Sequence, residues 1–190
     1  MTWACGIPGT VGGGVVQNAG AHGRSMADVL QSVTVLDEQD TTRRIPAKEL
    51  ELVYRGSILK KGTARASVIL SAEMALQRGD PAELTALMAE YNAWRRKHQP
   101  VGANCGSVFK NPPGDYAGRL IEAAGLKGER AGGAEISSLH ANFIVNTGGA
   151  TADEVMALIE QTRDKVLRQF GVTLELEIEL VGEWQTGDRG

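Results

Sequence analysis

Alternation of apolar and polar residues predicts strands at several points along the chain. Residues 32–37, SVTVLD, and residues 67–76, SVILSAEMAL, follow the two-residue period of a strand. The clearest alternation lies in residues 172–182, VTLELEIELVG, where leucine and isoleucine occupy one face and glutamate the other. This is the pattern of an amphipathic strand. A further short strand is expected at residues 142–146, NFIVN.

The first predicted helix has a well-defined start. Asp80 is a candidate N-cap, Pro81 suits the first helical position, and Glu83 stands at the capping-box spacing. The apolar residues of this helix recur at helical spacing and are expected to lie in the core. They are Leu84, Leu87, Met88, Tyr91 and Trp94.

Two more helices are expected in the second half of the chain. The segment YAGRLIEAAG, residues 116–125, predicts a short helix that Gly125 ends. The longest predicted helix begins with a capping box formed by Thr151 and Glu154 and ends at Gly171.

The order of these elements predicts the domain organisation. A turn-rich linker follows the first helix, so we place a boundary near residues 97–104 and expect domains at 1–96 and 97–190. Strands and helices are mixed along the chain, which favours an α+β fold. Residues 6–25 are expected to be loop throughout.

Composition narrows the classes of protein to consider. The 190 residues are 42% hydrophobic and 23% charged, with a formal net charge of −3. No clustered positive charge points to nucleic acid or a membrane surface. No apolar run approaches the ~20 residues of a membrane span, and no signal-peptide pattern follows Met1, so a cytoplasmic location is expected. Cys5 and Cys105 predict neither a disulfide framework nor a metal site, and Cys105 is expected to be a buried, inert thiol.

The stretch GIPGTVGGGVVQNAGAHG, residues 6–23, contains seven glycines. It lacks the lysine-containing pattern of a P-loop and the G-x-G-x-x-G fingerprint of dinucleotide-binding domains. Two interpretations remain open. Its backbone N–H groups could form a nest for anionic oxygens, or its glycines could simply allow tight turns.

A set of motifs resembles the UDP-N-acetylenolpyruvoylglucosamine reductase family, whose members are also called UDP-N-acetylmuramate dehydrogenases. GIPGTVGG followed by NAGAHG is similar to the flavin-binding segment of that family. The later motifs follow in the family's order: YRGS (54–57), GSVFKNP (106–112), HANFIVN (140–146) and ELEIELVG (175–182). The similarity spans residues 4–183.

The resemblance implies a fold and a missing part. Residues 1–96 would be the C-terminal half of a FAD-binding domain like that of vanillyl-alcohol oxidase, and residues 97–190 a small α/β substrate-binding domain. The family's first half of the flavin domain, with another glycine loop that contacts the FAD diphosphate, is expected to lie outside this chain. A chain carrying that half is an expected partner.

The resemblance also implies an activity. NADPH would reduce FAD, which passes hydride to C3 of the enolpyruvyl ether of UDP-N-acetylglucosamine, and a proton would then reach C2. The product would be UDP-N-acetylmuramate for peptidoglycan synthesis. Two alternatives stay open: a redox-inactive fragment that binds the UDP-sugar, and a related flavoprotein with another substrate.

Family motifs assign candidate roles to particular residues. Arg55 would stabilise the developing enolate, Ser107 would donate the proton to C2, and Glu177 would act as a proton source or orienting group. Without the resemblance, Arg55 reads as a surface arginine and Ser107 as a turn serine. Tyr54 and Asn111 would bind substrate. The expected FAD contacts are Gly6, Ile7, Pro8, Gly9, Thr10, Gly12, Gly13, Asn18, Ala19 and Gly20.

The pattern alone does not separate the three glutamates near the C-terminus. Glu175, Glu177 and Glu179 share one predicted strand face, and a solvated face would account for all of them. Only the family's E-[IV]-x-x-x-G spacing selects Glu177. His140 has no assigned role and is expected to be a structural histidine.

Overall fold

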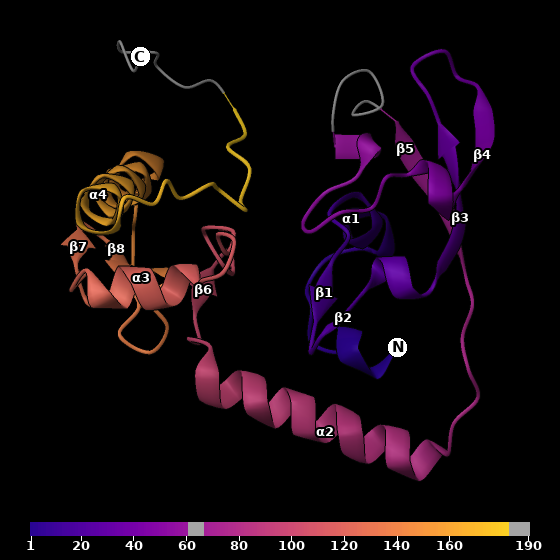
Figure 1. Ribbon diagram of the computed structural model, residues 1–190, viewed down its shortest axis with the longest axis horizontal. Coiled ribbons are helices and arrows are strands. Elements are labelled where there is room, and N and C mark those ends of the chain that lie inside the picture. The colour runs from indigo at the N-terminus through magenta and orange to yellow at the C-terminus, as the bar shows by residue number, and fades with distance from the viewer. Residues whose placement is uncertain (61–66, 183–190) are drawn as a thin grey trace. The chain divides into compact units, whose positions relative to one another are not determined.

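The computed structural model describes residues 1–60 and 67–182 (Figure 1). The chain forms two compact units, Met1–Arg95 and Arg96–Gly190. The division falls near the end of the helix Pro81–His98 rather than in the linker that follows it, so the boundary near residues 97–104 stays a prediction. Residues 183–190, which the second predicted domain includes, lie outside the described residues. Within the described part, no helix has both the length and the apolar character needed to cross a membrane.

A three-stranded antiparallel sheet of order β4-β3-β5 forms the centre of the first unit. Its strands are β3 (Leu30–Leu36), β4 (Thr42–Pro46) and β5 (Val68–Met74). The strands expected at residues 32–37 and 67–76 are thus confirmed as β3 and β5. Val33 and Val35 on the central strand are fully buried, because they pack in the hydrophobic core of this unit. Short 3₁₀ turns complete this unit at Thr2–Ala4, Met26–Asp28, Ala47–Glu49 and Ile58–Lys60.

The glycine-rich stretch is not loop throughout, so that prediction is wrong. It contains helix α1 (Val11–Val16) and a small hairpin of β1 (Gly20–Ala21) and β2 (Arg24–Ser25). The Thr10 hydroxyl accepts the Gly13 N–H at 3.1 Å and caps the helix, while Val15 is fully buried. A cap and one anchored side chain therefore overcome the low helix propensity of glycine.

Helix α2 (Pro81–His98) begins where the sequence predicts. The Asp80 carboxylate accepts the N–H groups of Ala82 at 2.9 Å and Glu83 at 3.0 Å, as an N-cap does.

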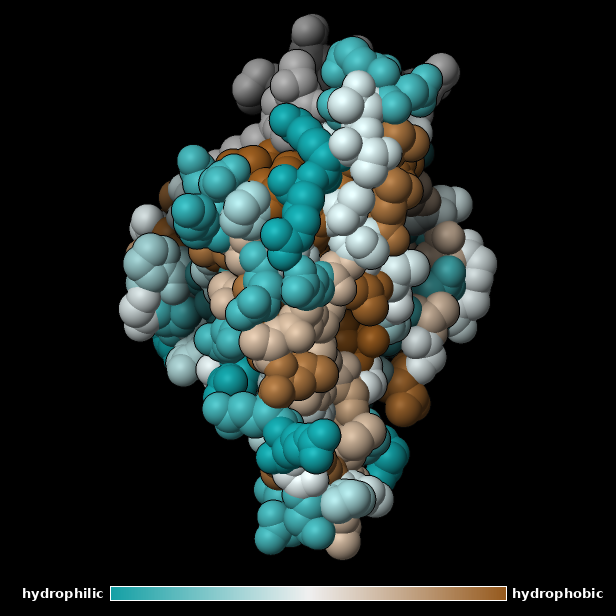
Figure 2. Space-filling model, turned by 90° about the vertical axis from the view of Figure 1, so that its right-hand side faces the viewer, coloured by the Kyte–Doolittle hydropathy of each residue, from teal (hydrophilic) through white to brown (hydrophobic). Residues whose placement is uncertain are grey.

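The prediction that the apolar stripe of α2 lies in the core is wrong for the stripe as a whole, although Tyr91 is partly buried and packs against the core of the first unit. No residue of α2 is buried in the described structure, and Leu84, Met88 and Trp94 are 39%, 41% and 47% exposed. Periodicity predicts a helix with one apolar face, but burial depends on what the fold places against it. Figure 2, which looks at the side of the first unit, shows hydrophobic residues at the surface among hydrophilic ones.

The second unit combines an antiparallel sheet with two helices. The sheet has the order β6-β9-β8-β7, and helix α4 lies over β7 and β8 (Figure 1). The elements are β6 (Ala103–Asn104), α3 (Ala117–Ala123), β7 (Arg130–Ala131), β8 (Ala134–Ile136), β9 (Ile144–Asn146) and α4 (Ala152–Phe170). All pairings are antiparallel, so the unit is α+β and the expected α/β arrangement is corrected. The strand expected at residues 142–146 is confirmed as β9.

The predicted capping box and the predicted terminal glycines of the helices in the second unit are confirmed. The Thr151 and Glu154 side chains form a reciprocal capping box at the start of α4. Gly171, directly after α4, has φ +68°, and Gly125, two residues after the end of α3, has φ +70°, so both take left-handed conformations.

The amphipathic strand expected at residues 172–182 does not form, and that prediction is wrong. Only a single bridge, Phe109 to Leu176, pairs this segment with the rest of the described chain. The segment around Phe109 that pairs with it is short, so alternation alone does not produce an extended strand. Leu174 is fully buried, whereas Leu180 at the far end is 41% exposed.

Cys105 also differs from expectation, because the residue is exposed rather than buried. Partial desolvation of its thiol raises its pKa.

Candidate active site

In the first unit, the glycine-rich stretch and the YRGS turn are joined by hydrogen bonds. The Asn18 side chain donates to the Val53 carbonyl at 2.9 Å and accepts the Ala27 N–H at 3.0 Å. The Ser57 hydroxyl donates to the Val16 carbonyl at 2.8 Å. The bonds to the Val53 and Val16 carbonyls connect segments more than 30 residues apart in sequence. The predicted FAD-contacting loop and the predicted catalytic turn therefore form one local structure.

Arg55 is oriented by both segments. Its backbone has φ +55°, a left-handed conformation that is uncommon for arginine, at the tip of the turn closed by Val53 and Gly56. Its guanidinium donates to the Gly20 carbonyl at 3.3 Å and lies 5.1 Å from the centre of the Tyr54 ring. The structure thus brings Arg55, Tyr54 and the glycine-rich stretch together.

The expected FAD-contacting residues differ in exposure. Gly6, Pro8, Gly9, Thr10 and Gly13 are exposed, whereas Asn18 is buried within the hydrogen bonds described above. The remaining ones are half-buried: Ile7, Gly12, Ala19 and Gly20. Gly9 has φ +112° and nothing within 4 Å of the position that a Cβ would take. The backbone from Gly9 into α1 therefore presents an open surface with few side chains.

The second unit contains a hollow of about 410 Å³, which we call the Ser107 hollow. Ser107 and Asn111, from the GSVFKNP motif, both line it. Its other polar lining comes from helix α3 and the HANF segment, through Tyr116, Arg119, Glu122, His140 and Asn142. The predicted proton donor and one predicted substrate-binding residue therefore face the same space.

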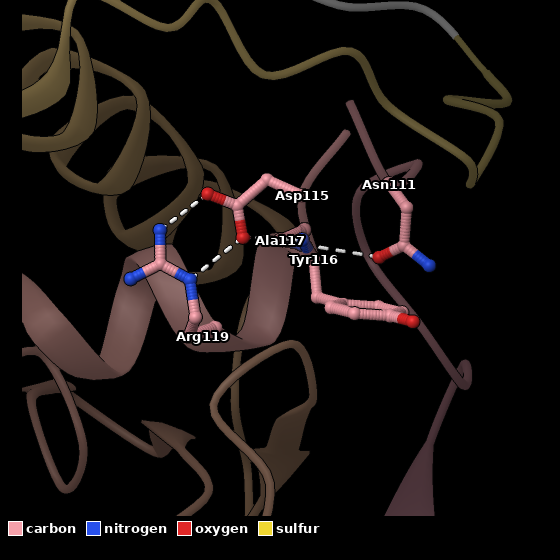
Figure 3. A network of polar contacts seen from close by, with 5 residues as sticks. All are labelled: Asn111, Asp115, Tyr116, Ala117 and Arg119. Carbon is pink, nitrogen blue, oxygen red and sulfur yellow. Dashed lines mark hydrogen bonds and ion pairs between the residues drawn. The ribbon is translucent and has the colours of Figure 1, made fainter. Parts of the chain in front are cut away.

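Asn111 is oriented by the start of helix α3 (Figure 3). Its side-chain oxygen accepts the Ala117 N–H at 3.0 Å, so its amide nitrogen points away from the helix. Asp115 accepts the Tyr116 N–H at 2.7 Å and pairs with both Nε and a terminal nitrogen of Arg119. Hydrogen bonds from Arg119 and from the Tyr116 backbone lower the pKa of Asp115 to about 2. This ion pair restrains the side chain of Arg119, one of the residues that line the hollow.

His140 lines the hollow as a neutral hydrogen-bond donor. Its Nδ1 accepts the Asn142 N–H at 3.2 Å, which places the proton of the neutral ring on Nε2. Burial disfavours the imidazolium and lowers the pKa of His140, and the nearby Lys127 charge lowers it further. The ring also packs edge-on against Phe143, with the ring centres 4.9 Å apart.

Glu177 lies beside the GSVFKNP segment but does not line the hollow, as far as the described residues extend. Its backbone N–H donates to the Val108 carbonyl at 2.8 Å, one residue from Ser107. The Glu175 carboxylate lies 3.1 Å from the Lys110 ammonium, and the Glu175 side chain is 73% exposed. Glu177 is half-buried whereas Glu175 and Glu179 are exposed, although alternation treats the three alike.

Sequence reasoning missed several residues of this site. His140 was expected to be structural, yet it lines the hollow with Ser107 and Asn111. Tyr116 and Arg119 were not singled out. The sequence connected His140, Tyr116 and Arg119 with the site only through their position, because all three belong to motifs that follow GSVFKNP in the chain.

Comparisons with known proteins agree with the resemblance. A sequence model of the C-terminal domain of UDP-N-acetylenolpyruvoylglucosamine reductase matches residues 97–181. The UDP-N-acetylenolpyruvoylglucosamine reductase of Chloroflexus aurantiacus is 50% identical over 183 residues, which cover 95% of this chain and 62% of that protein. The protein of the same name from Gloeobacter violaceus is 45% identical over 185 residues, or 96% of this chain and 61% of that protein.

A solved structure agrees as well. The crystal structure of UDP-N-acetylenolpyruvylglucosamine reductase from Thermus caldophilus matches with a TM-score of 0.81 and 38% identity, covering 94% of this chain and 62% of that one. This chain therefore spans less than two thirds of the length of these relatives. The ordered motifs, the domain match and the identities of 45–50% all point to the UDP-N-acetylenolpyruvoylglucosamine reductase family, and residues 97–181 match the C-terminal domain of that family.

Proposed function

We propose that this chain forms part of a cytoplasmic NADPH- and FAD-dependent enzyme that reduces the enolpyruvyl ether of UDP-N-acetylglucosamine to UDP-N-acetylmuramate for peptidoglycan synthesis. The observation that carries the proposal is the Ser107 hollow, where the donor group of Ser107 and the oriented amide of Asn111 line one space. A hollow that combines apolar lining with a few oriented donors suits a ligand rich in oxygen acceptors.

The first unit fits a role in holding FAD. The open backbone around Gly9 allows a ligand to approach closely, and α1 begins with N–H groups that no carbonyl of its own helix can accept. The residues that would hold the cofactor are those of the glycine-rich stretch from Gly6 to Gly20. When bound, FAD supplies the hydride that it has received from NADPH.

The residues of this chain would stabilise the negative charge that develops on the substrate and deliver the proton that C2 receives. Arg55 would stabilise the negative charge that develops toward the substrate carboxylate, because a fixed cation acts strongly where charge develops. The Ser107 hydroxyl would donate a proton to C2. A weak acid suffices when it is positioned, since the carbanion is a strong base. Glu177 would orient or replenish that proton, and Tyr54 and Asn111 would bind substrate.

The first experiment reconstitutes the enzyme. This chain is measured alone and after fusion to the N-terminal part of the Chloroflexus aurantiacus relative. We expect the fusion to show flavin absorption bands and to oxidise NADPH only when the enolpyruvyl substrate is present. Alone, the chain should bind FAD weakly, because a partial pocket buries less of its ligand. A fusion that binds FAD but leaves the enolpyruvyl substrate unreduced would contradict the proposal.

The second experiment tests the proton donor in the same fusion. Ser107→Ala should leave reduction of FAD by NADPH nearly unchanged and slow reoxidation by the substrate by about 10²–10⁴-fold, as for loss of a general acid. Ser107→Cys retains a donor and should fall between wild type and alanine. Equal slowing of both half-reactions would indicate that Ser107 has a structural role.

One observation favours a second candidate function, binding of the UDP-sugar without redox activity. All lining residues of the Ser107 hollow belong to the second unit, so this unit could bind the sugar nucleotide by itself. Tight substrate binding by this chain, together with a fusion that holds no flavin, would favour this candidate. A flavin-bearing fusion that reduces a different enone or enol ether would instead favour a related flavoprotein.

A further inference from the structure

The segment of residues 108–110 is paired with a side chain on one edge and with backbone on the other. On one edge, the Asn142 side-chain oxygen accepts the Phe109 N–H at 2.9 Å and its amide nitrogen donates to the Phe109 carbonyl at 2.8 Å. On the other edge, the Lys110 N–H donates to the Glu175 carbonyl and the Glu177 N–H donates to the Val108 carbonyl, both at 2.8 Å. The amide of Asn142 thus takes the place of a strand residue.

This substitution needs an amide. In an antiparallel hydrogen-bonded pair, two residues exchange both N–H···O bonds, and the Asn142 side chain reproduces that exchange within one planar group. A carboxylate could accept from Phe109 but could not donate to its carbonyl, and an apolar side chain could do neither. Asn142 is 3% exposed and Phe109 is 2% exposed, so water has little access to replace either bond.

The backbone of Asn142 is itself held in place. Its carbonyl accepts the Val108 N–H at 2.9 Å, and its N–H donates to Nδ1 of His140 at 3.2 Å. Asn142 therefore contacts two consecutive residues between Ser107 and Asn111. Ser107 and Asn111 both line the Ser107 hollow, and Asn142 holds the segment between them.

We propose that Asn142 is a positioning residue that fixes Ser107 and Asn111 at the hollow by serving as the strand partner of Phe109. The structural part of this proposal stands by itself; its consequence for substrate rests on the proposed function. Asn142 is not expected to exchange protons with the substrate. Its effect passes through the backbone of residues 108–110.

The test uses the 190-residue chain and the variant Asn142→Asp, studied by NMR at pH 8 and pH 5. At pH 8 the new carboxylate cannot donate to the Phe109 carbonyl. We expect the amide hydrogens of Phe109 and Glu177 to exchange about tenfold faster or more, since a buried acceptor loses its partner. The Ser107 backbone and Asn111 side-chain signals should shift, and affinity for UDP-N-acetylglucosamine enolpyruvate should fall by about tenfold.

At pH 5 the same variant should recover. Burial beside a carbonyl raises the pKa of a carboxyl group, and the protonated form again has one acceptor and one donor. His140, which contacts Asn142, and Lys110, Glu175 and Glu177 on the opposite edge also carry titratable groups. The wild-type chain measured at both pH values accounts for their contribution. A structural defect alone would not reverse with protonation of one introduced carboxyl group.

Asn146→Asp is the matched control. The Asn146 side-chain oxygen accepts the N–H groups of Gly148 at 2.9 Å and Ala150 at 3.1 Å, so a carboxylate keeps both bonds. This variant should behave like wild type at both pH values. Signals from helix α4 report whether the unit remains folded, and Asn142→Gln, which keeps the amide on a longer side chain, provides a second variant.

Wild-type exchange rates in Asn142→Asp at pH 8, or losses that persist at pH 5, would overturn the proposal. Faster exchange with unchanged Ser107 and Asn111 signals would also overturn it, because Asn142 would then serve stability alone. If the wild-type chain fails to bind the enolpyruvyl substrate, the proposed function is in question, while the exchange and signal data still decide the role of Asn142.

Discussion

Gly118 on helix α3 faces the ring of His140. A methyl group on Gly118 would lie 3.0 Å from Cε1 and 3.4 Å from Nδ1 of that ring. Gly118 has an ordinary helical backbone, so space rather than conformation favours glycine here. The glycine thereby leaves room for the ring that accepts the Asn142 N–H.

Gly118→Ala should therefore destabilise the second unit by about 1 kcal/mol, although alanine normally stabilises a helix by a similar amount relative to glycine. In a His140→Ala background the same substitution should become stabilising, because the obstructing ring is gone. Urea unfolding of the two single variants and the double variant measures this change of sign. Destabilisation of equal size in both backgrounds would show that the ring is not the cause.

Asn18 should contribute strongly to the stability of the first unit. Asn18→Ala removes both hydrogen bonds of a buried side chain and places alanine at φ +44°. We expect a loss of about 2–3 kcal/mol, since the Val53 carbonyl and the Ala27 N–H lose their partners. Asn18→Gly tolerates the backbone conformation and separates the hydrogen bonds from the strain. Equal stability of the glycine variant and wild type in urea unfolding would assign the effect to strain alone.

The three glutamates near the C-terminus should differ in the flavin-containing fusion. Glu177→Gln should lower turnover by about 10²–10⁴-fold if its carboxyl group serves proton transfer. Glu175→Gln removes a largely exposed ion pair with Lys110 and should cost less than about 1 kcal/mol of stability with little change in turnover. Glu179→Gln, at another exposed position, serves as a further control. Similar small effects in steady-state rates at all three positions would leave Glu177 without a catalytic role.

The second unit should lose stability as the pH falls below about 6.5, the ordinary pKa of histidine. Burial lowers the pKa of His140, so below about 6.5 the unfolded chain binds a proton that the native state does not. This stability is fully present above the unfolded pKa and declines as the pH falls toward the lower native pKa. His140→Gln should flatten that part of the profile in unfolding experiments between pH 5 and 8.

His22 provides an independent comparison for the pH profile. Burial and the Arg95 charge lower its pKa as well, and it stacks on Tyr91 in the first unit, with the ring centres 3.8 Å apart. His22→Gln should remove a separate share of the pH dependence. An unaltered slope in His140→Gln would mean that His140 is not linked to stability in this range.

Features that depend on neighbouring residues could be predicted from the sequence. The starts of α2 and α4 follow from Asp80 and Thr151, whose side chains cap backbone groups two or three residues ahead. The ends of α3 and α4 follow from glycines that adopt positive φ. The helix α1 was missed because three of its six residues are glycines, and its stability comes from one cap and one buried valine.

Features that depend on distant residues were decided by the tertiary structure. Alternation predicted a strand at residues 172–182, but among residues 1–60 and 67–182 its one bridge is to Phe109, so no extended strand forms there. Periodicity predicted a buried stripe on α2, yet the fold leaves that helix without a buried residue in the described structure. In each case the pattern describes what a segment could bury or pair, while the partner is set elsewhere in the chain.

The candidate site shows the same division. Motif spacing selected Ser107, Asn111 and Glu177, but it gave no reason to connect them with His140 or Asn142. The hydrogen bonds between Asn142 and Phe109 join residues 33 positions apart, and no local pattern encodes such a pair. The sequence by itself therefore determined the helix ends, because these depend on short-range contacts, and the resemblance of its motifs to a known family named the candidate chemical groups. Only the folded chain decided which groups share a hollow, because that depends on long-range packing.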